Sequence, residues 1–185
     1  MPFSIHLAQT NPYPMGLEID RAEGIFIWDK FGKKYMDLIS GLAVANIGHR
    51  HPDVIKAIQI QLESYLHVIP YGEFSQDPQN LLADKLASLL PDSLNCSYFV
   101  NSGTEANEAA LKLAKRITGR YEIVAMKGSY HGATHGSLSV TGNEVKKQHF
   151  RPFVPGTTFI AFNKTDDLHQ ITKKTAAVIV EPVQG

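Results

Sequence analysis

The stretch "FVNSGTEANEAALKLAK", residues 99–115, changes its pattern abruptly at Asn101. An apolar run ends there, and the residues after the corner are mostly Ala, Leu, Glu and Lys, all of them strong helix formers. The pattern predicts that a strand near 97–101 hands over to a helix over 104–118. The corner between them consists of small residues, two of which carry a hydroxyl group.

This corner, Ser102-Gly103-Thr104, has the chemistry of a phosphate site. The first N–H groups of a helix lack helical partners, and the peptide dipoles place about half a positive charge there. A glycine lets the backbone come close to a ligand, and the two hydroxyls add donors. The alternative is an ordinary helix cap, in which Ser102 or Thr104 binds N–H groups of its own helix. The corner matches neither the Walker loop nor the dinucleotide-binding glycine motif.

Working outward from the corner, short apolar runs alternate with helical patterns in the second half of the chain. We expect strands at the apolar runs 96–100, 122–126, 157–162 and 176–182, and helices over 104–118, about 133–140 and 165–174. This alternation predicts an α/β fold whose mainly parallel sheet is covered by helices on both faces. The run "AAVIV" (176–180) is continuous, as in a fully buried strand.

The first half of the chain has a different pattern. Residues 17–40 predict β-structure with a chain reversal at "DKFGKK" (29–34), whereas "GLAVAN" (41–46) is irregular. Two amphipathic helices are expected in 51–66 and 75–92. We place a domain boundary near residue 70, so that residues 1–70 form an N-terminal segment with a β-hairpin and a helix, and 71–185 belong to a larger α/β domain.

A second group of candidate residues comes after the strand expected at 122–126, in "KGSYHGATHG" (127–136). Ligands bind beyond the carboxyl ends of the strands in open parallel sheets. Tyr130 and His131 are expected there, and a tyrosine ring can stack on a planar ligand. Alternatively, Tyr130 is a loop aromatic that packs on the end of the sheet. His131 and His135 have the i, i+4 spacing of some metal ligands, but no third ligand is near them in sequence, and we expect no metal.

Glu181 ends an apolar strand pattern and precedes Pro182. Core packing explains a carboxylate at this position poorly, so Glu181 is a candidate ligand-binding residue. The alternative is a helix cap or an ion-pair partner at the rim of the sheet.

The composition excludes several kinds of protein. The 185 residues are 43% hydrophobic and 19% charged, with a formal net charge of zero, which indicates a globular protein and gives no reason to expect nucleic acid or a membrane as partner. The single cysteine, Cys96, cannot form an internal disulfide, which suits a reducing compartment. We see no signal peptide and no run long enough to span a bilayer, so a cytoplasmic location is expected.

Five blocks of sequence extend over nearly the whole chain: "GIFIWDKFGKKYMDL" (24–38), "NIGHRHPDVIKAI" (46–58), "FVNSGTEANEAALKLAK" (99–115), "YHG" (130–132) and "VIVEPVQG" (178–185). In their order and spacing, these blocks resemble the class III aminotransferases of the ornithine and acetylornithine type, which use pyridoxal phosphate on the fold-type-I scaffold.

The resemblance implies a role for each candidate residue. Gly103 and Thr104 would give backbone donors to the phosphate of pyridoxal 5′-phosphate, with Ser102 beside them. Tyr130 would stack on the pyridine ring, flanked by His131, and Glu181 would lie near the cofactor. The segment around Leu42 would lie near the substrate entry and the subunit interface of a homodimer.

The resemblance also implies an activity and a sheet arrangement. The reaction would move an amino group from an amine or amino acid donor to a 2-oxo acid. The strands near 122–127, 157–161 and 176–181 would lie together, with the strand near 97–101 to one side, in a sheet that is incomplete at its C-terminal side. Residues 71–185 would then be the first part of the cofactor-binding large domain.

Two departures from the family pattern affect these expectations. Ala133 stands where ornithine- and acetylornithine-type members usually carry an arginine, whose bidentate fork a methyl group cannot replace. Leu42 stands where ornithine-specific members tend to have tyrosine. Both departures argue against ornithine and acetylornithine as the donor.

The family's catalytic residues are expected beyond Gly185: the aspartate that pairs with the pyridine nitrogen, the lysine that forms the Schiff base and an arginine for the substrate. We therefore interpret the chain as the N-terminal part of a longer enzyme, inactive alone. The alternatives are a class III relative that isomerises or decarboxylates its substrate, and a non-catalytic module that binds a phosphate ligand.

Overall fold

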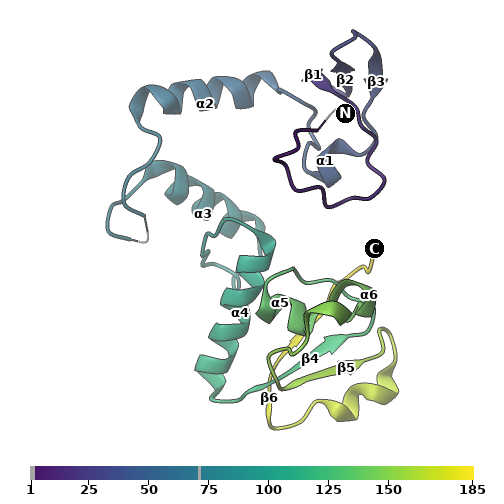
Figure 1. Ribbon diagram of the computed structural model, residues 1–185. Helices are drawn as coiled ribbons and strands as arrows, with labels where there is room; N and C mark the ends of the chain where they lie inside the picture. The colour runs from purple at the N-terminus through teal and green to yellow at the C-terminus, as the bar shows by residue number, and fades with distance from the viewer. Residues whose placement is uncertain (1–2, 71) are drawn as a thin grey trace. The chain divides into compact units, whose positions relative to one another are not determined.

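The computed structural model describes residues 3–70 and 72–185 (Figure 1). Contacts divide the chain into two units, Met1–Gln76 and Asp77–Gly185, and each is described by itself.

The first unit contains an antiparallel meander of strands β1 (Ile19–Glu23), β2 (Phe26–Asp29) and β3 (Lys34–Met36), in the order β1-β2-β3. The predicted β-structure and chain reversal are confirmed. In the turn between β2 and β3, Oδ1 of Asp29 accepts hydrogen bonds from the backbone N–H groups of Phe31 and Lys33, each at 2.9 Å. Gly32 in this turn has a φ of +80°, which glycine adopts without steric cost.

The expected irregular segment contains α1 (Ser40–Ala43), a turn whose backbone is left-handed throughout. Its φ angles run from 54° at Ser40 to 64° at Ala43, although only Gly41 is a glycine. Left-handed backbone costs non-glycine residues roughly 1–2 kcal/mol each, so this turn stores local strain. The N–H groups of Ile39 and Ser40 both donate to Oδ1 of Asp37, at 3.0 and 2.9 Å, and hold its start.

The second helix of this unit, α2 (Pro52–Ser64), confirms the amphipathic helix expected in 51–66. Pro52 is in the first turn, where its missing N–H has no helical partner in any case. Asp53 in the same turn complements the positive end of the helix dipole.

The second unit is built around a parallel sheet of β4 (Glu122–Met126), β5 (Thr157–Ile160) and β6 (Thr175–Ile179), in the order β5-β4-β6. In the register of this sheet, Ala125 pairs with Phe159 on one side and with Ile179 on the other. The expected clustering of these strands is confirmed.

The core of the unit lies on both faces of β4. Ile123 and Ala125 pack with Leu111 of α4 and Val140 of α5, whereas Val124 and Met126 form a second cluster with Ile160. Because β4 has a neighbour on each side, it is the most buried strand.

The expectation that "AAVIV" (176–180) forms a fully buried strand is wrong. The strand ends at Ile179, and Val178 and Val180 are 41% and 50% exposed. The physical reason is that β6, within the described sheet, has a neighbour on one side only.

The helices of this unit are α3 (Asp77–Leu89), α4 (Gly103–Thr118), α5 (His135–Val140) and α6 (Glu144–Lys147), with the short 3-10 helix η1 (Gln148–Phe150) after them. The helices predicted over 75–92, 104–118 and about 133–140 are confirmed within a few residues. In Figure 1, α4 and α5 both lie against the sheet, as their contacts with β6 and β4 require.

The strand expected at 96–100 is not formed. No described strand pairs with this segment, and no ladder of backbone hydrogen bonds joins it to another part of the described chain. A strand needs such a ladder, so the apolar β-forming pattern alone is insufficient.

The helix expected over 165–174 is also shorter than predicted. It is a 3-10 helix, η2 (Thr165–Gln170). Oδ2 of Asp167 accepts the N–H of Ala161 at 2.8 Å, so this first-turn side chain faces the end of β5. Thr172 and Thr175 then form a turn, in which the N–H of Thr172 donates to the Thr175 hydroxyl at 3.0 Å.

Across residues 3–70 and 72–185, no helix has both the length and the apolar character needed to cross a membrane.

Candidate functional site

The corner between residue 101 and α4 is a capped helix start. Ser102 is extended, and its hydroxyl oxygen accepts the N–H of Glu105 at 3.3 Å. The Glu105 carboxylate reaches back and accepts the N–H of Asn101 at 2.8 Å. This reciprocal arrangement resembles a capping box shifted by one residue. The helix-cap interpretation of Ser102 is therefore correct for its oxygen atom, while its proton remains available for donation.

The cap does not use the next two amides. Among the hydrogen bonds of the described residues, none is donated by the N–H of Gly103 or Thr104. A Cβ atom added to Gly103 would meet no atom within 4 Å, and its φ lies outside the left-handed region. Nothing in the surrounding chain therefore requires glycine at this position. The open space lets an external group come close to the backbone here.

The loop after β4 carries Tyr130 and His131 at the carboxyl end of the strand, as predicted. Tyr130 is 51% exposed, so its ring is available to a ligand rather than packed in the core. His131 is held from two sides. Its N–H donates to the Thr141 hydroxyl at 3.0 Å, and its carbonyl oxygen accepts from the Asn107 side chain at 2.6 Å.

Glu181 lies beside this loop. One of its carboxylate oxygens, Oε1, accepts the backbone N–H of Tyr130 at 3.1 Å. Because β4 and β6 are parallel neighbours, their carboxyl ends meet at one edge of the sheet, which explains this contact across 51 positions of sequence. Within residues 3–70 and 72–185, Glu181 forms no ion pair, so the ion-pair alternative is wrong for the described chain. The carboxylate binds a backbone amide of the ring-bearing loop.

A side chain that the sequence analysis did not select, Glu108, joins the corner to the loop. Its carboxylate accepts hydrogen bonds from the Thr134 hydroxyl and from the N–H of Ser137, the latter at 2.9 Å. Thr134 in turn bonds the Thr104 hydroxyl at 2.9 Å. The i, i+4 spacing of Thr104 and Glu108 on one helix face is a signal in the sequence by which this pair could have been found.

The His131 ring is buried among protein atoms, and its Nε2 has no hydrogen-bond partner in the described part of the chain. Burial lowers the pKa of the imidazole below the usual value of 6.5, against the opposing attraction of the Glu181 carboxylate. A buried polar atom without a partner is costly, so Nε2 is a place where a further group is expected to bind. His131 and His135 form no metal cluster, since no three potential ligand side chains gather among the described residues.

The burial of the His131 ring should make the stability of the folded chain depend on pH. Because the pKa of His131 is depressed on folding, the unfolded chain takes up the proton first. The folded chain should lose stability as the pH falls below about 6.5 and through the folded-state pKa. We expect the ring signal of His131 in NMR spectra to titrate below the usual histidine range. In His131→Gln, the thermal midpoint should depend less on pH in the same window. A titration of His131 above that range would mean that the attraction of the Glu181 carboxylate raises its pKa more than burial lowers it.

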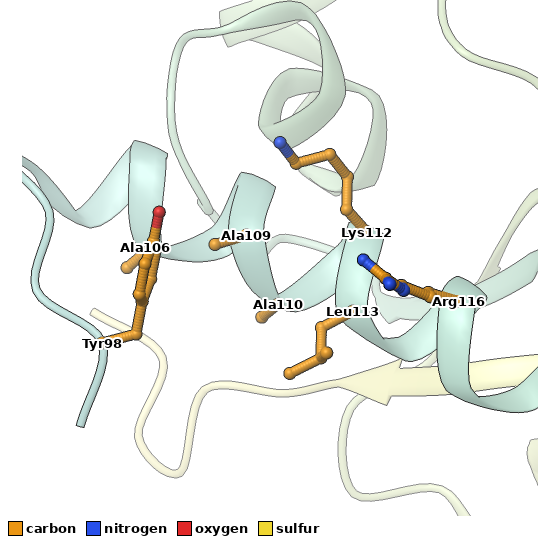
Figure 2. A pocket seen from close by; sticks show the side chains of 7 residues that line it. All are labelled: Tyr98, Ala106, Ala109, Ala110, Lys112, Leu113 and Arg116. Carbon is orange, nitrogen blue, oxygen red and sulfur yellow. The ribbon is translucent and has the colours of Figure 1, made fainter. Parts of the chain in front are cut away.

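A hollow of about 700 Å³ lies along the outer side of α4 rather than at its start. Figure 2 shows its apolar part, formed by Ala106, Ala109, Ala110 and Leu113, with the Tyr98 ring standing beside the helix. None of the predicted site residues lines it. The candidate site is therefore the corner at the N-terminus of α4, together with the loop after β4 and the end of β6.

Comparisons with known proteins identify the family of the chain. The family model "Aminotransferase class-III" matches residues 7–185. The chain belongs to the class-III aminotransferase family. It is 44% identical over 170 residues to a LysW-aminoadipate semialdehyde/glutamate semialdehyde transaminase of Sulfurisphaera tokodaii, covering 92% of this chain and 43% of the relative. It is 41% identical over 168 residues to an acetylornithine aminotransferase of Archaeoglobus fulgidus, covering 90% of this chain and 44% of the relative.

Solved structures of two transaminases have the same fold. An (S)-enantioselective omega-transaminase of Thermomicrobium roseum aligns with a TM-score of 0.85 at 29% identity, over 97% of this chain and 48% of that one. The ornithine aminotransferase of Toxoplasma gondii aligns with a TM-score of 0.80 at 26% identity, over 98% of this chain and 44% of the ornithine aminotransferase chain. The expected fold-type-I class is confirmed. This class-III chain spans less than half the length of these relatives.

The two positions that depart from the family pattern are both on the surface. Ala133 is exposed in the loop after β4, next to Thr134. Leu42 is 84% exposed in the left-handed turn of the first unit, with a φ of 62°.

Proposed function

We propose that this chain forms the pyridoxal-phosphate cradle of a class-III aminotransferase that moves an amino group from an amine or amino acid donor to a 2-oxo acid. The observation that carries the proposal is the helix start at Gly103 and Thr104. Both N–H groups lack protein partners among the described residues, although the amide of Glu105 is capped. The names of the relatives and the family match support a transaminase.

The residues present fit this cofactor. The open space at Gly103 admits a phosphate group, and two free amides at the positive end of a long helix suit its charge. The exposed Tyr130 ring offers a stacking surface. The unpartnered Nε2 of buried His131 provides a further polar contact on the same loop. The pyridoxal group, when bound, supplies the electron sink that amino transfer requires.

Each residue of the cradle would have a defined task. The N–H groups of Gly103 and Thr104 donate to the phosphate, and the Ser102 hydroxyl adds its proton. Tyr130 orients the planar ring. Glu181 accepts the Tyr130 amide and so holds the loop that carries this ring in place.

We propose that substrate recognition differs from that of enzymes with an arginine at position 133. Ala133 cannot make the two parallel hydrogen bonds that an arginine gives to a carboxylate. Recognition of a substrate carboxylate would therefore fall to other residues. A homodimer, which the family pattern implies, belongs to the same proposal.

Binding of pyridoxal phosphate to the chain tests the proposal directly. We expect weak, reversible binding with amide NMR shifts at Gly103 and Thr104. Phosphate contacts and one stacked ring contribute only about 1–3 kcal/mol each. After borohydride reduction, mass spectrometry should find sparse labelling across surface lysines, because the resemblance implies that the catalytic lysine is none of the lysines in this chain.

Two results would contradict these expectations. The absence of any shift at Gly103 and Thr104 at saturating pyridoxal phosphate would overturn the phosphate assignment. A single stoichiometric lysine adduct with amine-dependent turnover would show that the catalytic lysine is in this chain. An amine and keto-acid panel then distinguishes amino transfer from isomerisation or decarboxylation.

A further inference from the structure

Helix α5 lacks a cap from its own sequence, and Glu108 of α4 supplies one. The residue preceding α5, Thr134, makes no side-chain cap bond to the helix. Instead, Oε1 of Glu108 accepts the N–H of Ser137 in the first turn at 2.9 Å. A Cβ atom at Gly136 would collide with the Glu108 carboxylate, so the glycine is what lets the carboxylate come this close.

The direction of the hydrogen bonds around Glu108 is set by the number of protons available. Partial burial raises the pKa of Glu108, but hydrogen bonds from Thr134, Ser137 and Gly136 outweigh it and hold the pKa below the usual value. The carboxylate is therefore ionised at neutral pH and can only accept. Thr134 has one hydroxyl proton and donates it to Glu108. The bond of 2.9 Å between Thr104 and Thr134 must then be donated by Thr104.

We infer that Glu108 is a positioning residue for the phosphate corner: through Thr134 it turns the Thr104 hydroxyl proton away from the ligand, and it fastens the ring-bearing loop to α4. The inference rests on the proposed function, because only a bound phosphate gives the corner this role. It also corrects the expectation that both hydroxyls of the corner donate. Ser102 keeps a proton for the ligand, whereas Thr104 offers only its backbone N–H.

The contacts between the loop and α4 are tight enough for such coupling. The Ser137 hydroxyl donates to the Thr104 carbonyl at 2.9 Å. A Cβ atom at Gly132 would collide with the Thr104 side chain. Tyr130 and His131 directly precede this glycine in the loop. Loosening the Glu108 contacts should therefore move the stacking ring relative to the phosphate-binding amides.

The test uses Glu108→Gln, Thr134→Val and the double variant in the full chain. Glu144→Gln serves as a matched control. It removes the same charge from the same unit, at a carboxylate that pairs with Lys147 and Arg151 instead of the corner. Without ligand, we expect Thr134→Val to raise the pKa of Glu108, measured by carbon NMR of its carboxyl group. The N–H of Ser137 should stay protected from hydrogen exchange in both single variants, because an acceptor oxygen remains at position 108.

With pyridoxal phosphate as probe, each single variant should bind about three- to tenfold more weakly. Glutamine at position 108 accepts the Thr134 hydroxyl less strongly than a carboxylate does, and valine at position 134 removes that hydroxyl, so both variants loosen the loop that carries the stacking ring. The double variant should be no worse than either single, because both break the same chain of bonds. Additive losses would instead mean that Glu108 and Thr134 affect binding independently and not through one another. The Glu144→Gln control should bind like the unaltered chain.

The outcomes separate the inference from the proposed function. If the unaltered chain does not bind pyridoxal phosphate, the proposed function fails, while the ligand-free titration still reports the link between Glu108 and Thr134. If the unaltered chain binds but the losses add, or the Glu108 titration is the same in Thr134→Val, the positioning role is overturned. Should Glu108→Gln fail to fold, Thr134→Val carries both measurements.

Discussion

Replacing Gly142 with alanine is expected to lower the free energy of unfolding by about 3 kcal/mol, the upper end of the usual cost of overpacking. A Cβ atom there would collide with the carbonyl oxygen of Met126 and approach the Gly128 nitrogen to 2.9 Å. These are backbone atoms at the end of β4 and cannot rotate away. The loop would have to move and weaken the bonds that Gly142 exchanges with Gly128 and Ser129, at 3.2 and 3.0 Å.

Thermal unfolding of the full chain measures this effect. A loss of this size should lower the midpoint by about 10 °C in a unit of this length. Gly103→Ala is the matched control, since the same methyl group meets no atom within 4 Å there and should leave the midpoint unchanged or slightly higher. Equal midpoints for Gly142→Ala and the unaltered chain would show that the end of β4 yields to the added methyl group at little cost.

Replacing Gly103 with valine should affect ligand binding instead of stability. We expect little change in the free energy of unfolding and a large loss of affinity for pyridoxal phosphate. The branched side chain would fill the open space in front of the N–H groups of Gly103 and Thr104. A phosphate group pushed away loses at least two charge-assisted hydrogen bonds, about 3–6 kcal/mol in total, which is a hundredfold or more in affinity.

Equilibrium dialysis with pyridoxal phosphate gives the affinity, and the thermal midpoint of the same samples gives the stability. Ala106→Val is the control, because it adds a branched side chain to the same helix next to Glu105, outside the pair of free amides. An affinity of Gly103→Val equal to that of the unaltered chain would show that the phosphate lies elsewhere. Lower stability without ligand would show that Gly103 has a structural role that its surroundings do not reveal.

Much of the second unit could be predicted from sequence because local pattern and packing agree there. Helix α4 combines strong helix formers with Ser102 at its start and Gly119 just past its end, where a φ of 65° suits glycine. Residues 123–126 of β4 are continuously apolar and are buried from both faces. The phosphate corner arises from the same local signals, since free amides at a helix start need no distant residue to create them.

The apolar sequence pattern gave wrong predictions for segments whose structure depends on neighbouring strands. Residues 96–100 have the composition of a strand, but no described strand pairs with them. The run over β6 is as apolar as a central strand, yet β6 lies at an edge of the described sheet. Strand formation and burial depend on which backbone lies alongside, and composition does not encode that.

The sequence by itself determined the class of the fold, the family and the helix start that suits a phosphate. The tertiary structure alone decided how the other site residues act. It brings Glu108 against Thr134 across 26 positions and Glu181 against Tyr130 across 51, and it buries the His131 ring with one nitrogen unpartnered among the described residues. The physical reason is that hydrogen-bond partners and desolvation are properties of segments brought together by folding. The helix start depends on the local backbone alone.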